Sequence, residues 1–470
     1  MHDAISRRQP LARRVSQAGG LVVATLCVLM PPSRVPHTAQ TRVGAGRFVM
    51  RLMAARISPN PVSITVDERT RRVFVLSEGP LSESSPSRPY PELVGPGSVA
   101  VLDAATGRLV RTTRVGINPV QAALDVTAGR LYVLSQQPFE LGTFDVPQAG
   151  SVAVLDAATG ALVRTTEVGI NAVALAVDER HKRVFALARE PQGSDDFSSG
   201  ATSVLDAATG TLLRTLSDVG GTALAVNART GRLFVASARP CPPAPSLDEA
   251  NPGCLDVVDA TTGRQLATHP LSQTVGPRAM AIDDLAGRVV ALLEGMRGGV
   301  SDAQYVSHAA TFDATTGAPL RSVKISRDRS AYAFALSVTA GRAVVVVGPD
   351  GYDIQMGNSG SARTSVVETR SGRVLSTAGG AVGPYGLDAD VVIDARAGCI
   401  VVLAQPLSDA HSSPGGPATV MVLDARTGRL LHTAPGQVGD VALGLDAVRG
   451  HLFVANARTD TVRMLDVVRL

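Results

Sequence analysis

The chain has 470 residues, of which 45% are hydrophobic, 18% charged and 3% aromatic, with 46 glycines and 29 prolines. This apolar fraction excludes a largely disordered chain, and the length indicates several domains or one large repeat architecture. The net charge of +4 comes from residues 1–57, which contain nine arginines and one acidic residue. Residues 58–470 contain the remaining 36 basic and 40 acidic residues and are mildly acidic. We therefore expect no nucleic-acid partner.

The N-terminal segment has the order of charge and hydrophobicity found in export signals. Four arginines up to Arg14 precede the apolar stretch Ala18–Met30, which two prolines end. As a helix this stretch would span about 20 Å, which is short for a bilayer but suits a signal-peptide core. We predict that residues 1–45 are a signal peptide or N-terminal anchor plus linker, and that the protein is extracytoplasmic: secreted, periplasmic or at the cell surface. Translation starting at Met50 is the alternative.

The body of the chain is an internal repeat. The string VAVLDAATGRLVRTTRVG covers Val99–Gly116, and nearly the same string covers Val152–Gly169. Weaker copies follow at spacings of about 40 to 56 residues, the period of a propeller blade or a similar array. The acidic residue of each copy is Asp103, Asp156, Asp206, Asp259, Asp313, Glu368, Asp424 or Asp466.

Each copy alternates apolar and polar residues on both sides of D-A-x-T-G, as in two half-buried strands joined by a tight turn. Asp accepts hydrogen bonds from turn amides, and Gly takes the positive φ that closes the hairpin. We therefore interpret the repeated Asp as structural and not as a row of catalytic carboxylates.

A second recurring unit lies between these hairpins, for example LDVTAGRLYVL over Leu124–Leu134. Its eight turn residues are Asp67, Asp125, Asp178, Asn227, Asp283, Ser337, Asp394 and Asp446. Each complete repeat thus supplies four strands, an inner A followed by B, C and D, which make one blade of a β-propeller.

The repeats account for 31 strands, one short of eight blades. Gly46–Ala55 has the pattern of the D strand Gly107–Gly116, so an N-terminal strand can pair with the last C strand and close the ring. We predict an all-β fold in which residues 46–470 form a single propeller of eight four-stranded antiparallel blades. A seven-bladed ring with an extra partial repeat is the alternative.

These motifs resemble the YVTN-type propeller repeat, the family that includes YncE-like proteins and archaeal surface-layer propellers. Gly116–Pro119 matches its G-x-x-P linker, Tyr132–Leu134 its Y-V-x, and Val99–Gly107 its V-x-V-L-D-x-x-T-G. The family's Asn is Ser135 in that repeat and returns as Asn456 in the last one. The resemblance implies the fold, while propellers carry many unrelated activities.

Several cofactor classes lack their motifs. The chain has no Trp, so the tryptophan docking motifs of eight-bladed quinoprotein dehydrogenases are missing. Haem-attachment, zinc-protease, nucleophile-elbow and P-loop motifs are missing as well. We predict no catalytic, cofactor-binding or metal-binding residues and no cofactor.

Function is expected on the face that carries the B–C loops, because these loops are long and differ between repeats. Tyrosines gather in the loops and linkers of this face, where they can act as binding anchors. We predict that an unknown protein or small-molecule ligand binds here. The candidate binding residues are Arg278, Tyr332, Tyr352, Tyr385, Asp388 and Asp440.

One B–C loop is bracketed by Cys241 and Cys254, and a disulfide here would close about 14 residues and stabilise the fold by about 3 kcal/mol. We leave the bridged and free states open.

Three functions remain in competition: a monomeric, non-catalytic binding protein, which we favour; a lactonase-like or other hydrolase with a polar channel that could contain a metal; and a structural module of the cell envelope. The N-terminal segment would place the binding protein near a membrane.

Overall fold

The protein is an eight-bladed β-propeller. The computed structural model describes residues 47–81, 93, 95–136, 149–189, 200–239, 241, 253–271, 276–297, 304–327, 330–337, 341–348, 363–379, 387–406 and 416–468. Within these residues 32 strands form eight four-stranded antiparallel sheets, and there is no helix. The predicted all-β, eight-bladed fold is confirmed, and the seven-bladed alternative is wrong. The predicted export segment lies outside the described residues.

Blades one to four follow one another along the chain, with the innermost strand of each given first. They contain β2 (Pro61–Asp67), β3 (Arg72–Ser77), β4 (Ser98–Asp103) and β5 (Leu109–Arg114); β6 (Pro119–Asp125), β7 (Arg130–Ser135), β8 (Ala149–Asp156) and β9 (Leu162–Ile170); β10 (Ala172–Asp178), β11 (Arg183–Ala188), β12 (Ala201–Asp206) and β13 (Leu212–Ser217); β14 (Ala223–Asn227), β15 (Arg232–Ser237), β16 (Cys254–Asp259) and β17 (Gln265–Pro270).

Blades five to eight complete the ring. They contain β18 (Pro277–Asp283), β19 (Arg288–Arg297), β20 (Gln304–Asp313) and β21 (Pro319–Arg327); β22 (Ser330–Ser337), β23 (Arg342–Gly348), β24 (Arg363–Glu368) and β25 (Arg373–Gly379); β26 (Leu387–Asp394), β27 (Cys399–Pro406), β28 (Pro417–Asp424) and β29 (Leu430–Val438); β30 (Asp440–Asp446), β31 (His451–Asn456), β32 (Thr461–Val468) and β1 (Arg47–Arg56).

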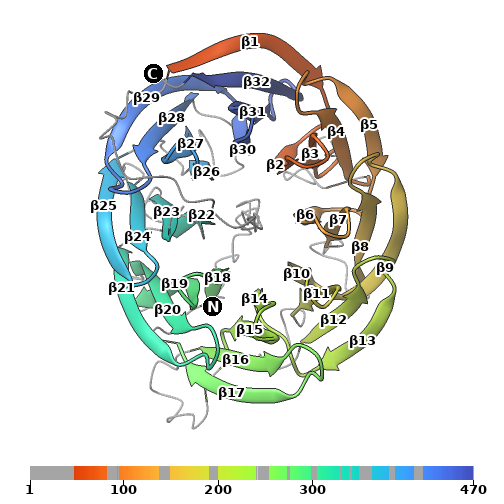
Figure 1. The fold of residues 1–470 in the computed structure, drawn as a ribbon, viewed down its shortest axis with the longest axis vertical. Coiled ribbons are helices and arrows are strands. Elements are labelled where there is room, and N and C mark those ends of the chain that lie inside the picture. Colours follow the sequence, from red (N-terminus) through yellow and green to blue (C-terminus); the bar gives the residue numbers. More distant parts are fainter. Residues whose placement is uncertain are drawn as a thin grey trace, which may run out of the picture.

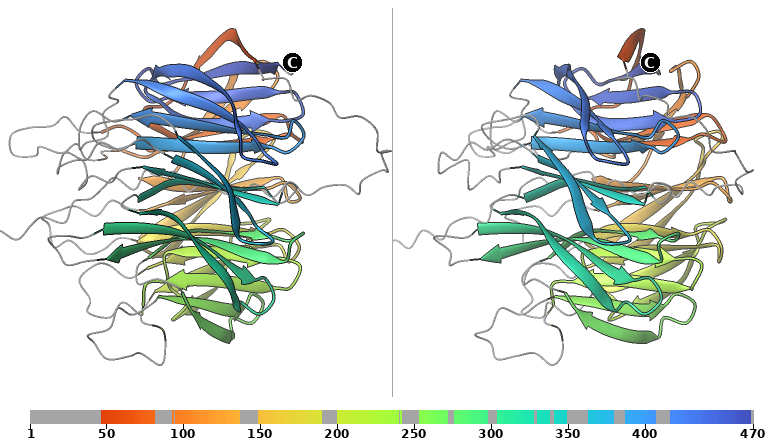
Figure 2. Two further views of the ribbon diagram at one scale, coloured as in Figure 1. Left: turned by 90° about the vertical axis from the view of Figure 1, so that its left-hand side faces the viewer. Right: turned by 60° about the vertical axis from the view of Figure 1, so that its left-hand side comes forward.

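The blades are arranged around a common axis with the A strands inside and the D strands outside (Figure 1). Seen from the side, the sheets stack as a twisted ring (Figure 2). The short A–B and C–D turns therefore lie on one face, which we call the turn face. The B–C connections and D–A linkers lie on the other, which we call the loop face.

The ring is closed by the two ends of the described chain. Strand β1 pairs antiparallel with β32, with Arg47 opposite Val468 and Arg56 opposite Thr461. The register shifts between Met50 and Ala54, which marks an irregularity in the outer strand. This pairing confirms the predicted N-terminal D strand and covers an edge that β32 would otherwise expose.

The core lies between the blades, because each sheet buries both of its faces against its neighbours. The B strands are consequently continuous apolar runs: Leu131, Tyr132 and Val133 of β7 are all fully buried. The Tyr132 hydroxyl donates to the Ala207 carbonyl of the next blade, and burial raises the pKa of this tyrosine. Similar apolar clusters join neighbouring blades around the ring, including the first and the eighth.

The repeated C–D turn is built as the sequence indicates. Asp103 Oδ1 accepts hydrogen bonds from the amides of Ala105 (3.1 Å) and Thr106 (2.9 Å), while Gly107 has a φ of 66°. In the third blade the hydroxyl of Thr209 lowers the pKa of Asp206 by the same arrangement. The repeated Asp is therefore a structural residue, as predicted.

Candidate functional site

On the turn face, the carboxylates at the ends of the A strands are used by the fold. Asp67 Oδ1 accepts from the amides of Arg69 (2.9 Å) and Thr70 (3.2 Å), and its other oxygen accepts from the Thr70 hydroxyl. Six further residues are equally buried at the same position: Asp125, Asp178, Asn227, Asp283, Asp394 and Asp446. Each accepts at least one amide of its own turn. This row closes turns and offers little to a ligand.

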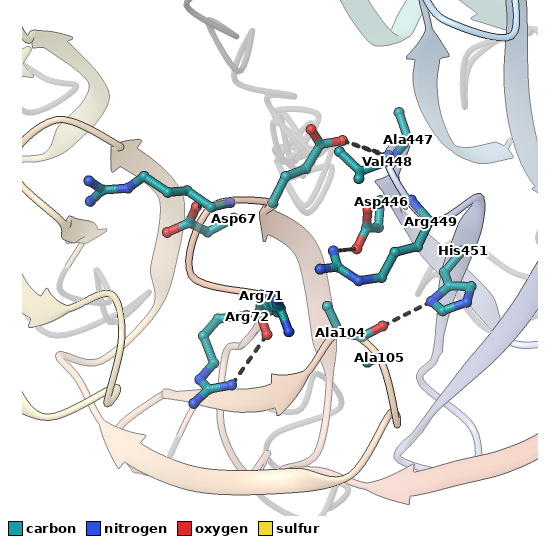
Figure 3. A network of polar contacts seen from close by, with 12 residues as sticks. Asp67, Arg71, Arg72, Ala104, Ala105, Asp446, Ala447, Val448, Arg449 and His451 are labelled. Carbon is teal, nitrogen blue, oxygen red and sulfur yellow. Dashed lines mark hydrogen bonds and ion pairs between the residues drawn. The ribbon is translucent and has the colours of Figure 1, made fainter.

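The neighbouring polar groups of the turn face join one blade to the next. Glu68 of blade one accepts from the amide of Ala447 in blade eight (2.9 Å), and the His451 ring contacts the Ala104 carbonyl across the same junction (2.9 Å) (Figure 3). Glu179 likewise accepts from the Thr127 hydroxyl of the preceding blade (2.8 Å). These contacts hold neighbouring blades together on the turn face.

On the loop face, backbone hydrogen bonds from the D–A linkers fix the residues that follow the B strands. Asn60, Asn118 and Asn171 enter the A strands of blades one to three with φ values of 55°, 52° and 54°. Asparagine adopts this left-handed conformation more readily than most residues. The carbonyl of Asn118 accepts from the amide of Gln136 (2.9 Å), and that of Asn171 from the amide of Arg189 (3.3 Å). The residues that follow the B strands are thus fixed at equivalent places.

In blade five this region carries an ion pair. Arg278, the second residue of β18, binds Glu294 near the far end of the antiparallel partner β19, with 2.5 Å between Nε and Oε2. The Glu294 side chain is 1% exposed, whereas the Arg278 side chain is 45% exposed. The pair therefore presents the guanidinium to solvent above a buried carboxylate.

The positive charge of Arg278 acts on Arg189 of blade three. Its Nε is buried and has no hydrogen-bond partner in the described part of the chain. Burial lowers the pKa of Arg189, and the positive charge of Arg278 lowers it further. Sequence analysis did not select Arg189. In the sequence, Arg189 stands six residues after the first residue of its B strand, and other blades have Glu78, Gln136 and Glu294 at this position.

Asp440, one of the predicted binding residues, is fully buried in blade eight. Its carboxylate accepts from the Gln437 amide (2.7 Å), the Asn456 side-chain amide (2.9 Å) and the Arg463 guanidinium (2.5 Å). Both oxygens are therefore engaged within the blade. The structure gives Asp440 a role in holding β30, β31 and β32 together.

The remaining candidates divide into two groups. Tyr332 and Asp388 lie within the inner strands β22 and β26 and not in the linkers where the sequence had placed them. Tyr332 falls at a register shift between β22 and β23, and Asp388 pairs with Gln405 of β27. Tyr352 and Tyr385 lie outside the described residues. Among those of the six candidates whose side chains the structure describes, Arg278 is the one that is exposed on the loop face.

Cys241 and Cys254 are adjacent, as their spacing suggested, but they are free thiols and no bridge joins them in the structure. Both side chains are buried. Burial and a hydrogen bond to the Cys241 thiol raise the pKa of Cys254. Arg239 and Asp256 form an ion pair in the same blade, with 2.5 Å between their charged atoms. The raised pKa makes the Cys254 thiol a poor nucleophile.

No cluster of three or more metal-ligating side chains occurs among the described residues. In the same ranges, no helix is long and apolar enough to cross a membrane.

Eight four-stranded blades in a closed ring define the chain as a β-propeller protein. No family model matches it, and no curated protein is similar to it in sequence. Its fold is similar to that of Kuenenia stuttgartiensis hydrazine synthase (13% identity, 88% of this chain and 97% of that one, TM-score 0.52) and Saccharomyces cerevisiae Sqt1 (11%, 91% and 100%, 0.56). Quinohemoprotein alcohol dehydrogenase from Comamonas testosteroni is similar too (13%, 90% and 77%, 0.51). At these identities the likeness shows the fold alone.

Proposed function

We propose that this chain is a YVTN-type, non-catalytic binding protein that works outside the cytoplasm and holds its partner or ligand on the loop face. The repeat motifs support the family, and the arginine-rich segment before residue 46 supports export and a position near a membrane. Propellers commonly combine a rigid ring with variable loops that bind.

One observation carries the choice of face. On the turn face the buried carboxylates close turns and join blades. On the loop face, Arg278 is exposed above a buried carboxylate, and Arg189 has a buried nitrogen with no partner in the described residues. Polar groups that the fold does not use are available for a ligand.

Footprinting by hydrogen exchange tests the face. The full chain, with and without an extract of secreted and envelope material from its source, should show protection in peptides covering 78–97, 136–150 and 294–307. The turn peptides around Asp103 to Gly107 should not change. Arg278→Gln with Glu294→Gln should remove the protection, whereas the turn-face pair Arg130→Gln with Asp156→Asn should keep it.

Two results would reject the proposal. One is protection confined to the turn face. The other is turnover of a lactone or ester at a rate abolished by changing one residue near the axis, which would make the protein a hydrolase. Mass measurement of the mature N-terminus tests export separately, since a chain that begins at its initiating Met would contradict a cleaved signal.

A further inference from the structure

The outer edge of blades one to three carries large apolar side chains that the ring leaves exposed. Strands β5, β9 and β13 each begin with two of them, and their exposed fractions lie between 45% and 53%. These six residues, which we call the apolar rim, are Leu109, Val110, Leu162, Val163, Leu212 and Leu213. No other D strand whose side chains the structure describes begins with two such residues, since β17 begins with Gln265 and β25 with Arg373.

Contacts between blades join these strand starts into one continuous row. The Thr113 hydroxyl of β5 donates to the Gly160 carbonyl of blade two (2.6 Å), and the Thr166 hydroxyl of β9 donates to the Gly210 carbonyl of blade three (2.6 Å). Each of these glycines stands two residues before the next apolar pair. The three strands accordingly lie side by side on the outside of the ring (Figure 1). A contiguous exposed apolar surface of this kind marks an interaction site.

Unpaired arginines accompany the apolar rim. Strands β5, β9 and β13 contain four arginines and one acidic residue, whereas residues 58–470 as a whole are mildly acidic. Arg111, Arg114 and Arg164 are exposed, and their side chains form no hydrogen bond or ion pair with any residue that the structure describes. The B-strand arginines of the same blades instead pair with C-strand carboxylates. The arginines of the rim are therefore available to an anionic partner.

The N-terminal segment joins the ring at the same edge. Strand β1 begins at Arg47, opposite Val468 near the end of the C strand β32, and C strands end on the turn face. Residues 1–46 therefore join the outside of blade eight at its turn-face end. Blade one is the next blade, and Leu109 and Val110 start β5 at that same end. An N-terminal segment held in a membrane would keep the apolar rim close to the bilayer.

We propose that the apolar rim docks on an anionic phospholipid bilayer, with its leucines and valines below the headgroups and Arg111 and Arg164 against lipid phosphates. The inference rests on the proposed position near a membrane and adds the surface that faces it. Buried apolar area and attraction to anionic lipids both strengthen binding at the water–lipid interface. A second copy of the chain fits less well, because a symmetric contact would bring arginines of the two rims together.

Tryptophan fluorescence tests the contact, because the chain has no tryptophan of its own. The full chain with Leu162→Trp is mixed with vesicles of equimolar phosphatidylcholine and phosphatidylglycerol whose acyl chains are brominated. The emission should shift to shorter wavelength and be quenched. Leu320→Trp is the matched control, since Leu320 is 49% exposed on the D strand of blade five, away from β5 on the ring (Figure 1). Its emission should not change, even where the N-terminal segment anchors the chain.

The arginines are tested in the chain that carries Leu162→Trp. Arg111→Gln with Arg164→Gln should weaken docking about thirtyfold, because each arginine near an anionic membrane contributes a factor of about five. Arg321→Gln with Arg373→Gln removes the same charge from the D strands of blades five and six and should leave the quenching unchanged. Vesicles of phosphatidylcholine alone and high salt should each reduce the quenching.

Three results would overturn the inference. The first is emission from Leu162→Trp that responds to vesicles no more than that of Leu320→Trp. The second is quenching that is equal on anionic and uncharged vesicles, or that is unaffected by the loss of Arg111 and Arg164. The third is self-association without lipid that Leu162→Arg abolishes, which would assign the rim to a second copy. Protection of the loop face is measured without vesicles and does not require the rim, so the two proposals fail separately.

Discussion

The turn face repeats one hydrogen-bonding scheme in blade after blade, whereas the loop face changes from each blade to the next. On the turn face Asp103, Asp156 and Asp259 each accept from their own turn and pair with an arginine of the adjacent B strand. On the loop face the equivalent places hold Glu78, Gln136, Arg189 and Glu294. A repeated environment constrains residue type, so the variable face is the one free to acquire a ligand.

Deeper in the ring, two junctions between neighbouring blades also differ, because one uses an amide side chain and the other a carboxyl group to bond the backbone of the next blade. Gln121, four residues before Asp125, donates to the Leu175 carbonyl (3.0 Å) and accepts from the Leu175 amide (2.7 Å) of the next blade. Asp390 occupies the same place before Asp394 and accepts from the amide of Leu443 (2.7 Å). An ionised carboxylate can only accept, so the two junctions should respond differently to pH.

The largest effect is expected in a repeated turn. Gly160 has a φ of 70°, and an added Cβ would lie 2.4 Å from Cγ2 of Val101. Gly160→Ala combines a left-handed backbone with this clash and should lower the free energy of unfolding by about 3 to 4 kcal/mol. Gly231→Ala is the matched control, since Gly231 has a φ of 63° and nothing within 4 Å. It should cost about 1 kcal/mol in denaturant unfolding. Equal losses at both positions would show that the tight contact between blades is unimportant.

The loop face should gain stability by oxidation, because Cys241 and Cys254 already touch. Bridging them should raise the free energy of unfolding by about 3 kcal/mol in the chain-entropy model for a loop of about 14 residues. Denaturant unfolding with and without a reductant measures the gain, and Cys254→Ser should abolish the difference. Thiol titration showing two free thiols after incubation with oxidised glutathione would contradict this expectation.

The junction at Asp390 should weaken as pH rises. Burial raises the pKa of Asp390 to about 7, above its value in an unfolded chain, so the neutral form is the one the fold favours. This contribution is complete below about pH 4 and is lost as pH rises through 7. Between pH 5 and 8 it amounts to on the order of 2 kcal/mol.

Asp390→Asn removes the titrating group and tests whether the contribution of Asp390 to stability falls as pH rises. Unfolding at pH 5, 6.5 and 8 should show the unchanged chain losing stability relative to Asp390→Asn. Gln121→Glu would introduce the same pH dependence at the other junction. A constant difference between Asp390→Asn and the unchanged chain over this range would mean that Asp390 does not titrate there.

Much of the fold could be predicted from sequence because its determinants are local. The acidic residue, the Thr or Ser and the Gly of each C–D turn are within five residues of one another, and Gly46–Ala55 could be matched to the D-strand pattern directly. The spacing of Cys241 and Cys254 left a bridge between them open, and the structure places the two thiols together. Their oxidation state could not be predicted, because it depends on the redox conditions and not on the pattern.

The site was harder to predict because its members come from different blades. Asp440 looked available, yet Arg463, two strands away in the same blade, neutralises it. Nothing near Arg189 in the sequence indicates that the charge of Arg278, two blades further along, lowers its pKa. Whether a charge is paired depends on which residues the folded strands bring together, and the order of residues along one strand does not show that.

The smallest effect is expected from comparing one ion pair on each face. Arg278–Glu294 has a carboxylate that is 1% exposed, whereas in Arg130–Asp156 the two side chains are 25% and 33% exposed. Double-mutant cycles with Gln and Asn substitutions should give a coupling of about 1 to 2 kcal/mol for the loop-face pair and below about 0.5 kcal/mol for the turn-face pair. Arg278→Gln alone should destabilise more than the double variant, because it leaves a buried charge without this partner. Equal couplings would mean that burial on the loop face adds nothing to the pair, and the contrast between the faces would then rest on Arg189.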